Sequence, residues 1–266
     1  MTLNRLIGHA LADLRGMSPL IHCITNHVTS GDTANMLLAA GASPIMADDP
    51  AESAEITAIA GGLTLNLGTP SQSRVEAMLR SGEEANSRGI PVVFDPVGVG
   101  CTGFRRESAA EIIRRVKLTA VRGNLSEMSF LAGFDSRENG VDSSETQISP
   151  REAAQTAARN LGCVCAVTGA IDVISDGERT AVIRNGNPML RNITGAGCMT
   201  SALCAAFCSV SGAFAGTAAA ISFMDICGEL AAEHSGGAGS FRAALFDFAG
   251  NITPELLMER LDIDED

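Results

Sequence analysis

Short apolar segments alternate with segments of helical character along most of this sequence, and this alternation limits the fold more than any other feature. The apolar segments are bounded by Gly, Pro or polar residues and are too short for helices. Several of the segments between them end in Gly, as helices do. Apolar strands that alternate with helices are typical of a mainly parallel sheet covered by helices on both faces. The sequence therefore predicts an α/β fold with a central, mainly parallel sheet.

The same pattern predicts the order of the elements. We expect strands at residues 19–24, 42–47, 63–68, 90–98, 118–124, 163–169 and 172–177, with a hairpin partner at 178–186. We expect helices at residues 1–20, 33–41, 50–62, 70–89, 105–117 and 151–162, and a helical remainder after residue 186. The polar segment 133–150 is expected to be a surface excursion. A length of 266 residues fits one large α/β domain or two small ones. The sequence shows no internal repeat or low-complexity linker, and residues 1–266 are predicted to form a single domain.

Charge and aromatic content limit the class of ligand. The formal net charge of −12 argues against nucleic acids and anionic membranes as partners, because phosphate backbones require clustered Lys and Arg. A small phosphate ligand remains compatible, since a few backbone N–H groups are enough to hold one. The chain has no Trp or Tyr, so a ring in a ligand would be held by aliphatic, Met, Phe or backbone contacts.

A long uncharged segment, Asn192–Met224, raises the question of a membrane span. It consists mostly of small residues and is interrupted by "VSGAFAG", which predicts two buried helices joined by a Ser-Gly turn instead. The N-terminus predicts an amphipathic helix and not a signal peptide. The eight Cys include no CxxC pair and no zinc-ligand spacing, so all but one are interpreted as reduced, buried, small hydrophobic residues. These features predict a cytoplasmic protein.

Ligands of open α/β sheets bind beyond the carboxyl ends of the strands, so polar residues that follow predicted strands are the candidate site residues. They include Thr25, Asn26, His27, Asp48, Thr69, Asp95, Arg122, Asn124, Glu127 and Thr168. One loop that precedes a predicted helix adds Thr194, Gly195, Ala196, Gly197 and Cys198.

The loop "TGAGC", residues 194–198, is a candidate anion cradle. The first turn of a helix has unpaired N–H groups and carries the positive end of the helix dipole. Glycine at this place lets an anion approach the backbone closely. Thr194, Gly195, Ala196 and Gly197 are therefore candidates for phosphate binding. The alternative is a turn whose small residues only permit tight packing.

Two carboxylates that follow different strands are candidates for a metal–phosphate region. Asp95 ends one apolar segment, and Glu127 lies one turn into a helix after another. Carboxylates combined with water and phosphate oxygens suit Mg²⁺. The structural alternatives are a cap before Pro96 for Asp95 and a capping box with Asn124 for Glu127. Arg122 is a candidate for a phosphate contact or for a surface ion pair.

The chain lacks the sequence motifs of other nucleotide-binding and redox proteins. The Walker A pattern is absent, and no GxGxxG follows the first predicted strand, so neither a P-loop kinase nor a dinucleotide-binding fold is favoured. A thiol redox protein would require CxxC at a helix start, which the chain does not have.

Several blocks of the sequence together resemble the hydroxyethylthiazole kinase family. The blocks are "HCITNHVTSGDTANMLLAAGASPIMA", "LTLNLGT", "PVVFDPVGVGCTGFR", "VRGNLSEM", "AVTGAIDVISDG", "ITGAGCMTSA" and "GGAGSFRAALFD". They occur in order between Pro19 and Phe248, which is far more specific than any single block.

The resemblance implies a ribokinase-like three-layer α/β/α sandwich. It implies an enzyme that uses ATP and Mg²⁺ to phosphorylate the hydroxyl of 4-methyl-5-(2-hydroxyethyl)thiazole in thiamine biosynthesis or salvage. It also implies a homotrimer with each active site near a subunit boundary. By matching position, it implies thiazole contacts from Asn26, Met46 and Gly195, ATP contacts from Arg122 and Thr168, metal–phosphate contacts from Asp95 and Glu127, and a substrate-facing Cys198.

Cys198 is the candidate catalytic residue. A thiol has an ordinary pKa of about 8.5, and a helix N-terminus lowers it, so Cys198 is interpreted as the base that accepts the alcohol proton. The alternative is a small residue that fills space beside the reacting oxygen. Many members of the wider ribokinase-like superfamily carry Asp at this position, whereas the thiazole kinases resemble this chain in having Cys.

The chain departs from the family at His27, Gly31 and Asp32, where apolar and aromatic residues are usual. This departure predicts an altered wall of the thiazole pocket, with His27 interpreted as a hydrogen-bonded loop histidine. For Met46 the alternative to a thiazole contact is ordinary core packing at the end of a strand. Two alternative functions remain open: a kinase of another small heterocyclic alcohol, or a non-catalytic protein that binds thiazole or nucleotide.

Overall fold

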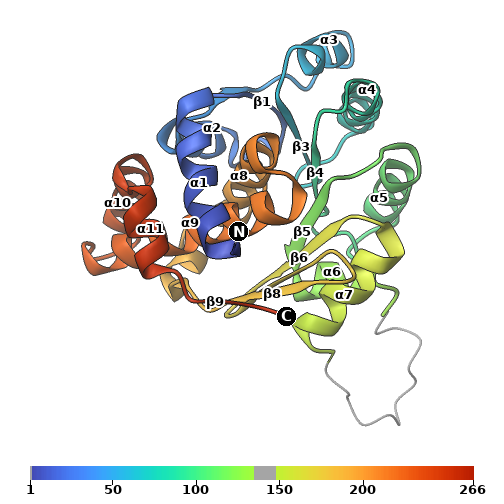
Figure 1. Ribbon diagram of the computed structural model, residues 1–266. Coiled ribbons are helices and arrows are strands. Elements are labelled where there is room, and N and C mark those ends of the chain that lie inside the picture. Colours follow the sequence, from blue (N-terminus) through green and yellow to red (C-terminus); the bar gives the residue numbers. More distant parts are fainter. Residues whose placement is uncertain (1, 135–147) are drawn as a thin grey trace.

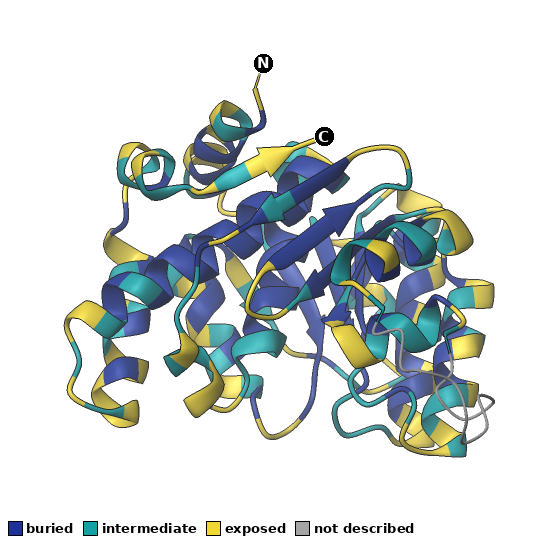
Figure 2. Cartoon of the chain, turned by 90° about the horizontal axis from the view of Figure 1, so that it is seen from below, coloured by how far each residue is buried: buried dark blue, intermediate teal, exposed yellow. Residues whose placement is uncertain are grey.

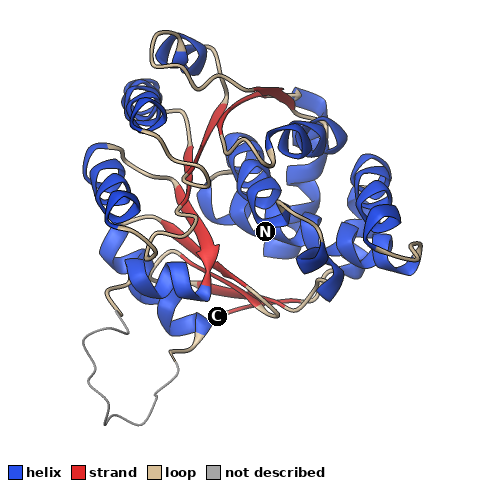
Figure 3. Cartoon of the chain, turned by 180° about the vertical axis from the view of Figure 1, so that it is seen from behind, coloured by secondary structure: helices blue, strands red, loops and turns tan. Residues whose placement is uncertain are grey.

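A single mixed sheet forms the centre of the molecule and lies between two layers of helices (Figures 1 and 3). The computed structural model describes residues 2–134 and 148–266. In that part of the chain the strand order is β2-β1-β3-β4-β5-β6-β7-β8-β9. The strands are β1 (Leu20–Ile24), β2 (Ser43–Ile45), β3 (Gly62–Asn66), β4 (Val92–Asp95), β5 (Ala120–Asn124), β6 (Val164–Thr168), β7 (Asp172–Ser175), β8 (Thr180–Ile183) and β9 (Ile263–Glu265).

The first six strands are parallel, and the last three are joined by antiparallel pairing. The inner parallel strands β3, β4 and β6 are mostly apolar and buried because helices cover both of their faces, as the sequence pattern predicts (Figure 2). Register places Asn66 opposite Asp95, and Asn124 opposite Thr168, at the carboxyl ends of adjacent strands. Polar residues that are distant in sequence therefore meet at one edge of the sheet.

The helices divide into two layers, each with its own hydrophobic core. One layer contains α1 (Leu3–Met17), α2 (Ser30–Ala40), α8 (Ala196–Ser211), α9 (Ala213–Glu233), α10 (Ala238–Asn251) and α11 (Pro254–Arg260). The other contains α4 (Gln72–Arg88), α5 (Gly103–Arg115), α6 (Leu125–Leu131) and α7 (Pro150–Leu161), and α3 (Ser53–Ala58) packs beside α4. A 3₁₀ helix, η1 (Pro188–Asn192), leads into α8.

The uncharged segment forms two helices joined at Gly212, as predicted. Gly212 has a positive φ of 80°, which ends α8 and lets the chain reverse. By length and composition α9 would be able to cross a membrane, but most of it is buried in the core of the protein. Burial between α1, α8 and α10 therefore accounts for its apolar character.

Two details of the predicted order were wrong. The end of the chain is not helical throughout, because β9 pairs antiparallel with β8 and is the last strand on that side of the sheet. The predicted helix at residues 50–62 is much shorter, since α3 covers only Ser53–Ala58. Most of the predicted excursion at 133–150 lies outside the described residues.

The cysteines are all free thiols, as expected, but fewer are buried than predicted. Cys23, Cys165, Cys204, Cys208 and Cys227 are buried. Cys101 is exposed, and Cys163 and Cys198 are intermediate.

Candidate active site

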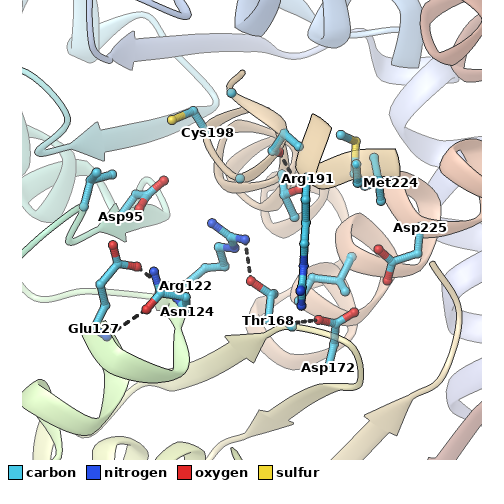
Figure 4. A pocket seen from close by; sticks show the side chains of 18 of the residues that line it. Asp95, Arg122, Asn124, Glu127, Thr168, Asp172, Arg191, Cys198, Met224 and Asp225 are labelled. Carbon is cyan, nitrogen blue, oxygen red and sulfur yellow. Dashed lines mark hydrogen bonds between the residues drawn. The ribbon is translucent and has the colours of Figure 1, made fainter. Parts of the chain in front are cut away.

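A cavity of about 500 Å³ opens at the carboxyl edge of the sheet, between the strand ends and the start of α8 (Figure 4). Most of the predicted site residues line this cavity. They are Asp95, Arg122, Glu127, Thr168, Gly195, Ala196, Gly197 and Cys198. The cavity thus brings together residues from β4, β5, β6, α6 and α8.

Three predicted residues do not belong to its lining. Asn26 is buried, with 4% exposure, and lies directly behind Cys198. Met46 is 36% exposed at the surface, so its alternative as a core residue was wrong. Thr194 is exposed on the loop before α8.

The start of α8 requires glycine at Gly195 and brings Gly197 close to the side chain of Arg122. Gly195 has φ 90°, and a Cβ there would lie 2.6 Å from Cγ2 of Thr29. A Cβ on Gly197 would lie 2.4 Å from Nη1 of Arg122. The small residues of the loop thus permit close packing, and they bring the guanidinium of Arg122 against the first turn of α8. Within the described residues no side chain caps this turn, so its N–H groups remain available to an anion.

Arg122 lines the cavity and forms no ion pair with the acidic residues that the structure describes, so within that part of the chain the surface ion pair considered as its alternative is not formed. Its Nη2 donates a hydrogen bond to Oγ1 of Thr168 on the neighbouring strand. Its Nε is buried and has no hydrogen-bond partner among the described residues. The guanidinium is therefore fixed between β6 and α8 with unused donor capacity.

Asp95 is almost completely buried at the end of β4, with 1% exposure. Its Oδ2 accepts hydrogen bonds from Nδ2 of Asn66 and Oγ of Ser201, both at 2.8 Å. Its Oδ1 has no partner within the described part of the chain. Because these partners are side chains of β3 and α8, the interpretation of Asp95 as a local cap was wrong. Burial raises the pKa of Asp95 to about 7, although the charge of Arg122 opposes this.

Glu127 forms the capping box that the sequence allowed. Its Oε2 accepts from the backbone N–H of Asn124 at 2.9 Å, and Oδ1 of Asn124 accepts from N–H of Glu127 at 3.0 Å. Its Oε1 also accepts from N–H of Gly98, at 2.9 Å, and so fixes the loop after β4. The carboxylate lines the cavity while it holds two backbone segments in place.

These residues fit a magnesium ion only when phosphate oxygens contribute to its shell. Among the described residues no group of three or more His, Cys, Asp or Glu side chains is placed to hold a metal. Asp95 has a free carboxylate oxygen, and Glu127 has both oxygens engaged by backbone donors. Mg²⁺ is commonly bound by one or two carboxylates together with substrate phosphates and water, which matches this arrangement.

Cys198 lies in the first turn of α8 with its sulfur partly buried. Nδ2 of Asn26 donates to Sγ at 3.2 Å. Burial raises the pKa of the Cys198 thiol, and the nearby charge of Asp95 raises it further, so the expectation of a lowered pKa was wrong. The reason is tertiary: removal of the thiolate from water and the negative charge of Asp95 outweigh the favourable hydrogen bonds.

Two acidic residues line the cavity at the end away from Cys198, and the sequence did not identify them as site residues. Asp172 and Asp225 are buried, with 4% and 9% exposure. Burial raises the pKa of both carboxyls, and they are close enough for the protonated one to donate to the other. One signal was available, since Asp225 is the first charged residue after the uncharged segment 192–224.

The apolar wall at this end of the cavity was also missed. It is formed by Leu190, Ile193, Ile221 and Met224. Nothing local in the sequence distinguishes these residues from core residues, because η1 and α9 form this wall only when they pack together.

A buried arginine fixes the loop that contains His27. Arg74 donates to Oδ2 of Asp48 and to the carbonyl of Thr69, both at 2.6 Å, and its Nη2 contacts the ring nitrogens of His27. The interpretation of His27 as a hydrogen-bonded loop histidine is confirmed. Asp32, the other charged departure, pairs with Arg242 of α10 at the surface.

Comparisons with known proteins agree on one family. The model of the hydroxyethylthiazole kinase family matches residues 11–255. A hydroxyethylthiazole kinase from Ruminiclostridium cellulolyticum is 45% identical over 268 residues, which cover 98% of this chain and 98% of the relative. One from Clostridium beijerinckii is 45% identical over 267 residues, which cover 97% of each.

Solved structures agree on the fold. A hydroxyethylthiazole kinase protein from Pyrococcus horikoshii aligns with a TM-score of 0.90 at 36% identity and covers 98% of both chains. A ribokinase-like superfamily protein from Enterococcus faecalis aligns with a TM-score of 0.65 over 96% of both chains, at 10% identity. The predicted ribokinase-like α/β/α sandwich is therefore confirmed.

Proposed function

The chain belongs to the hydroxyethylthiazole kinase family, and from this premise we propose that it transfers the terminal phosphoryl group of ATP to the hydroxyl of 4-methyl-5-(2-hydroxyethyl)thiazole in thiamine biosynthesis or salvage. One observation carries the assignment of this reaction to the cavity. The uncapped first turn of α8, Arg122 and Asp95 all line the same space, and Oδ1 of Asp95 is buried beside it without a partner among the described residues. We propose that the whole chain acts as one kinase domain.

The transferring phosphoryl group lies at the start of α8. Phosphoryl transfer requires alignment and charge stabilisation more than covalent chemistry from the protein. The backbone N–H groups of Gly195–Cys198 supply donors and the helix dipole supplies positive potential, while Arg122 adds a fixed positive charge beside Gly197. The exposed side chain of Thr194 borders this cradle.

The nucleotide extends from the cradle along the floor of the cavity. Arg122 and Thr168 are hydrogen-bonded to each other and contact its phosphates. The apolar wall of Leu190, Ile193, Ile221 and Met224 provides a surface for the base, as expected for a chain without Trp or Tyr. When Mg²⁺ is bound with the nucleotide, it neutralises charge on the phosphate oxygens beside Asp95 and Glu127.

The thiazole alcohol approaches from the side of Cys198 and Gly195. The thiol is neutral at physiological pH because its pKa is raised, so we assign it first to the orientation of the substrate oxygen. Cys198 can act as a base only as a thiolate, so its own proton must leave before it takes the alcohol proton. The negative charge of Asp95 opposes that loss until the bound nucleotide complex offsets it. Asn26 supports the sulfur from behind, and Met46 lies at the exposed rim.

We propose a homotrimeric, cytoplasmic enzyme. Apolar side chains remain exposed beside the loops that follow β1 and β2, with Val28 at 70% and Met46 at 36% exposure. A neighbouring subunit would cover these residues and complete the thiazole pocket. Free thiols at all eight cysteines suit a reducing compartment.

The test is ADP release from ATP with hydroxyethylthiazole as acceptor, with and without Mg²⁺. We expect ADP and the thiazole phosphate to form only when Mg²⁺ is present. Pyrimidine and pyridoxal alcohols serve as competing acceptors, and Asp247→Asn, an exposed change on α10, serves as a control that retains activity. If no alcohol supports ADP release although the protein binds ATP, the chain is a binding protein and the proposal fails.

A further inference from the structure

A closed ring of buried hydrogen bonds lies directly behind the reacting end of the cavity. Ser201 and Asn66 both donate to Oδ2 of Asp95, at 2.8 Å. Oδ1 of Asn66 accepts from Nδ2 of Asn26 at 3.1 Å, and the same Nδ2 donates to Sγ of Cys198 at 3.2 Å. The ring closes through α8, because Cys198 and Ser201 lie one turn apart on the same face of that helix.

The member that joins the two halves of this ring is Asn66. It is 1% exposed, lies at the end of β3 opposite Asp95, and does not line the cavity. Any effect of Asn66 on the reaction must therefore act through the residues that it holds. Burial makes the two links strong, since a buried amide that loses a partner is not compensated by water.

Backbone donors fix the direction of the hydrogen bonds that the two side-chain amides of the ring make. The N–H groups of Val28 and Thr29 donate to Oδ1 of Asn26, both at 3.1 Å, so the NH₂ group of Asn26 must face Asn66 and Cys198. The N–H of Gly68 donates to Oδ1 of Asn66 at 2.9 Å, so the NH₂ group of Asn66 must face Asp95. The side-chain amides cannot flip without opposing a backbone donor.

This fixed direction has a consequence for the sulfur. Because Asn26 offers only an N–H on that side, Sγ of Cys198 is an acceptor there, and the thiol hydrogen points away from Asn26. Cys198 lines the cavity, and the side chains of Thr29 and Asn66 also lie within hydrogen-bonding reach of its sulfur. The substrate side therefore receives only the hydrogen or lone pair that these neighbours leave unused.

We propose that Asn66 is a positioning residue for the phosphoryl transfer, which anchors Asn26 on Asp95 and thereby fixes the orientation of the Cys198 sulfur toward the acceptor hydroxyl. This inference rests on the proposed kinase function. The proposal gives a role in the reaction to a residue that does not line the cavity.

The kinetic test compares Asn66→Ala with a matched control. Small displacements away from the reacting atoms lower rates by up to about 100-fold, so we expect kcat to fall about 10- to 100-fold while KM for ATP changes little. The control is Asn185→Ala, because Asn185 is also buried and links Glu229, Arg260 and Asp262 far from the reacting end. It should lower stability without lowering kcat. A loss of stability with unchanged kcat in Asn66→Ala would overturn the proposal.

A double variant tests whether Asn66 acts through the sulfur. Residues that act as a unit have non-additive effects, so Asn66→Ala with Cys198→Ala should be no slower than the slower single variant. If the two losses multiply, Asn66 does not work through Cys198 and the proposal is wrong.

A spectroscopic test needs no substrate. The S–H stretching band of Cys198 is identified in the infrared spectrum of the unliganded protein by its loss in Cys198→Ala. We expect Asn66→Ala to shift this band. Asn66→Asp keeps the acceptor for Asn26 and Gly68, and in its protonated form it also replaces the donor to Asp95. At low pH it should therefore leave the band nearer the wild-type position, and it serves if the alanine variant does not fold.

An unshifted band in Asn66→Ala would overturn the positioning role. Absence of phosphoryl transfer in the wild-type protein would instead refute the proposed function, while the infrared band would still decide whether the ring orients the sulfur. The two failures are therefore distinguishable.

Discussion

Asp95 is a buried residue whose free energy in the site depends on whether a ligand is bound. The carboxyl is linked to Asn66 and Ser201 through one oxygen and leaves the other unpartnered among the described residues. A buried carboxylate with an unused oxygen is costly in the unliganded protein. A cation or hydrogen-bond donor that arrives with the nucleotide would offset that cost. The site should therefore favour the nucleotide together with its cation over the nucleotide alone.

The free energy of unfolding should report this cost through its pH dependence. The pKa of Asp95 is raised by burial from 3.8 to about 7, so the folded protein takes up a proton that the unfolded chain does not hold between these values. The unliganded protein should therefore lose stability as pH rises through this range, and Asp95→Asn should flatten the decline. Urea unfolding at a series of pH values measures the effect.

The matched control for this change is Asp247→Asn, which removes an exposed carboxyl of α10. It should leave the pH dependence of stability as in the wild-type protein. Parallel pH curves for the wild-type protein and Asp95→Asn would show that Asp95 ionises without a cost and would contradict the prediction.

The pair α8 and α9 is the element on which the cradle depends. α8 carries the cradle at its first turn, while the rest of the helix is buried between the sheet and α9. Gly216 allows the two helices to approach, because a Cβ there would lie 2.6 Å from the backbone nitrogen of Cys208. A helix this deeply buried keeps its first turn in a fixed place relative to the strand ends.

Gly216→Ala should separate these helices. The new methyl group meets backbone and not a flexible side chain, so we expect a loss of about 1–3 kcal/mol in the free energy of unfolding. Denaturant unfolding measures it. Gly16→Ala in α1 is the control, because a Cβ there contacts nothing within 4 Å, and it should stabilise the protein slightly. Equal stability of the two variants would show that the helices do not require the glycine.

At the scale of the whole molecule, the exposed apolar side chains near the cavity point to the proposed trimer. Val28 and Met46 follow the carboxyl ends of the neighbouring strands β1 and β2, so both lie at the edge of the sheet where the cavity opens. Their exposure leaves apolar surface at this edge of the sheet, on the side where we propose that the thiazole binds.

Sedimentation of the wild-type protein should give three times the mass of the chain. Val28→Glu should weaken this assembly, since it places a charge on the surface that a neighbouring subunit would bury. Met17→Glu is the control, because Met17 is similarly exposed, at 65%, but lies at the opposite edge of the sheet before β1. A monomeric wild-type protein, or equal effects of the two changes, would contradict the trimer.

The sequence alone determined the order of the elements from α1 to β8, except for the length of α3, and the edge of the sheet at which the candidate site lies. Strand and helix patterns are local, and parallel strands necessarily bring their carboxyl ends together, so Asp95, Arg122, Thr168 and the loop before α8 were identifiable from their positions in the chain. The capping box of α6 was identifiable for the same reason, because its two residues are three positions apart.

The tertiary structure decided everything that depends on burial and on partners distant in sequence. The ring through Asn66, the acidic pair of Asp172 and Asp225, and the pairing of β9 join segments that no local pattern connects. The raised pKa of Cys198 has the same origin: a helix start by itself favours the thiolate, but desolvation and a neighbouring carboxylate reverse that preference. Short-range periodicity determines which residues lie at the carboxyl ends of the strands. The free energy of a charged group at that place depends on all the groups that surround it in the folded protein.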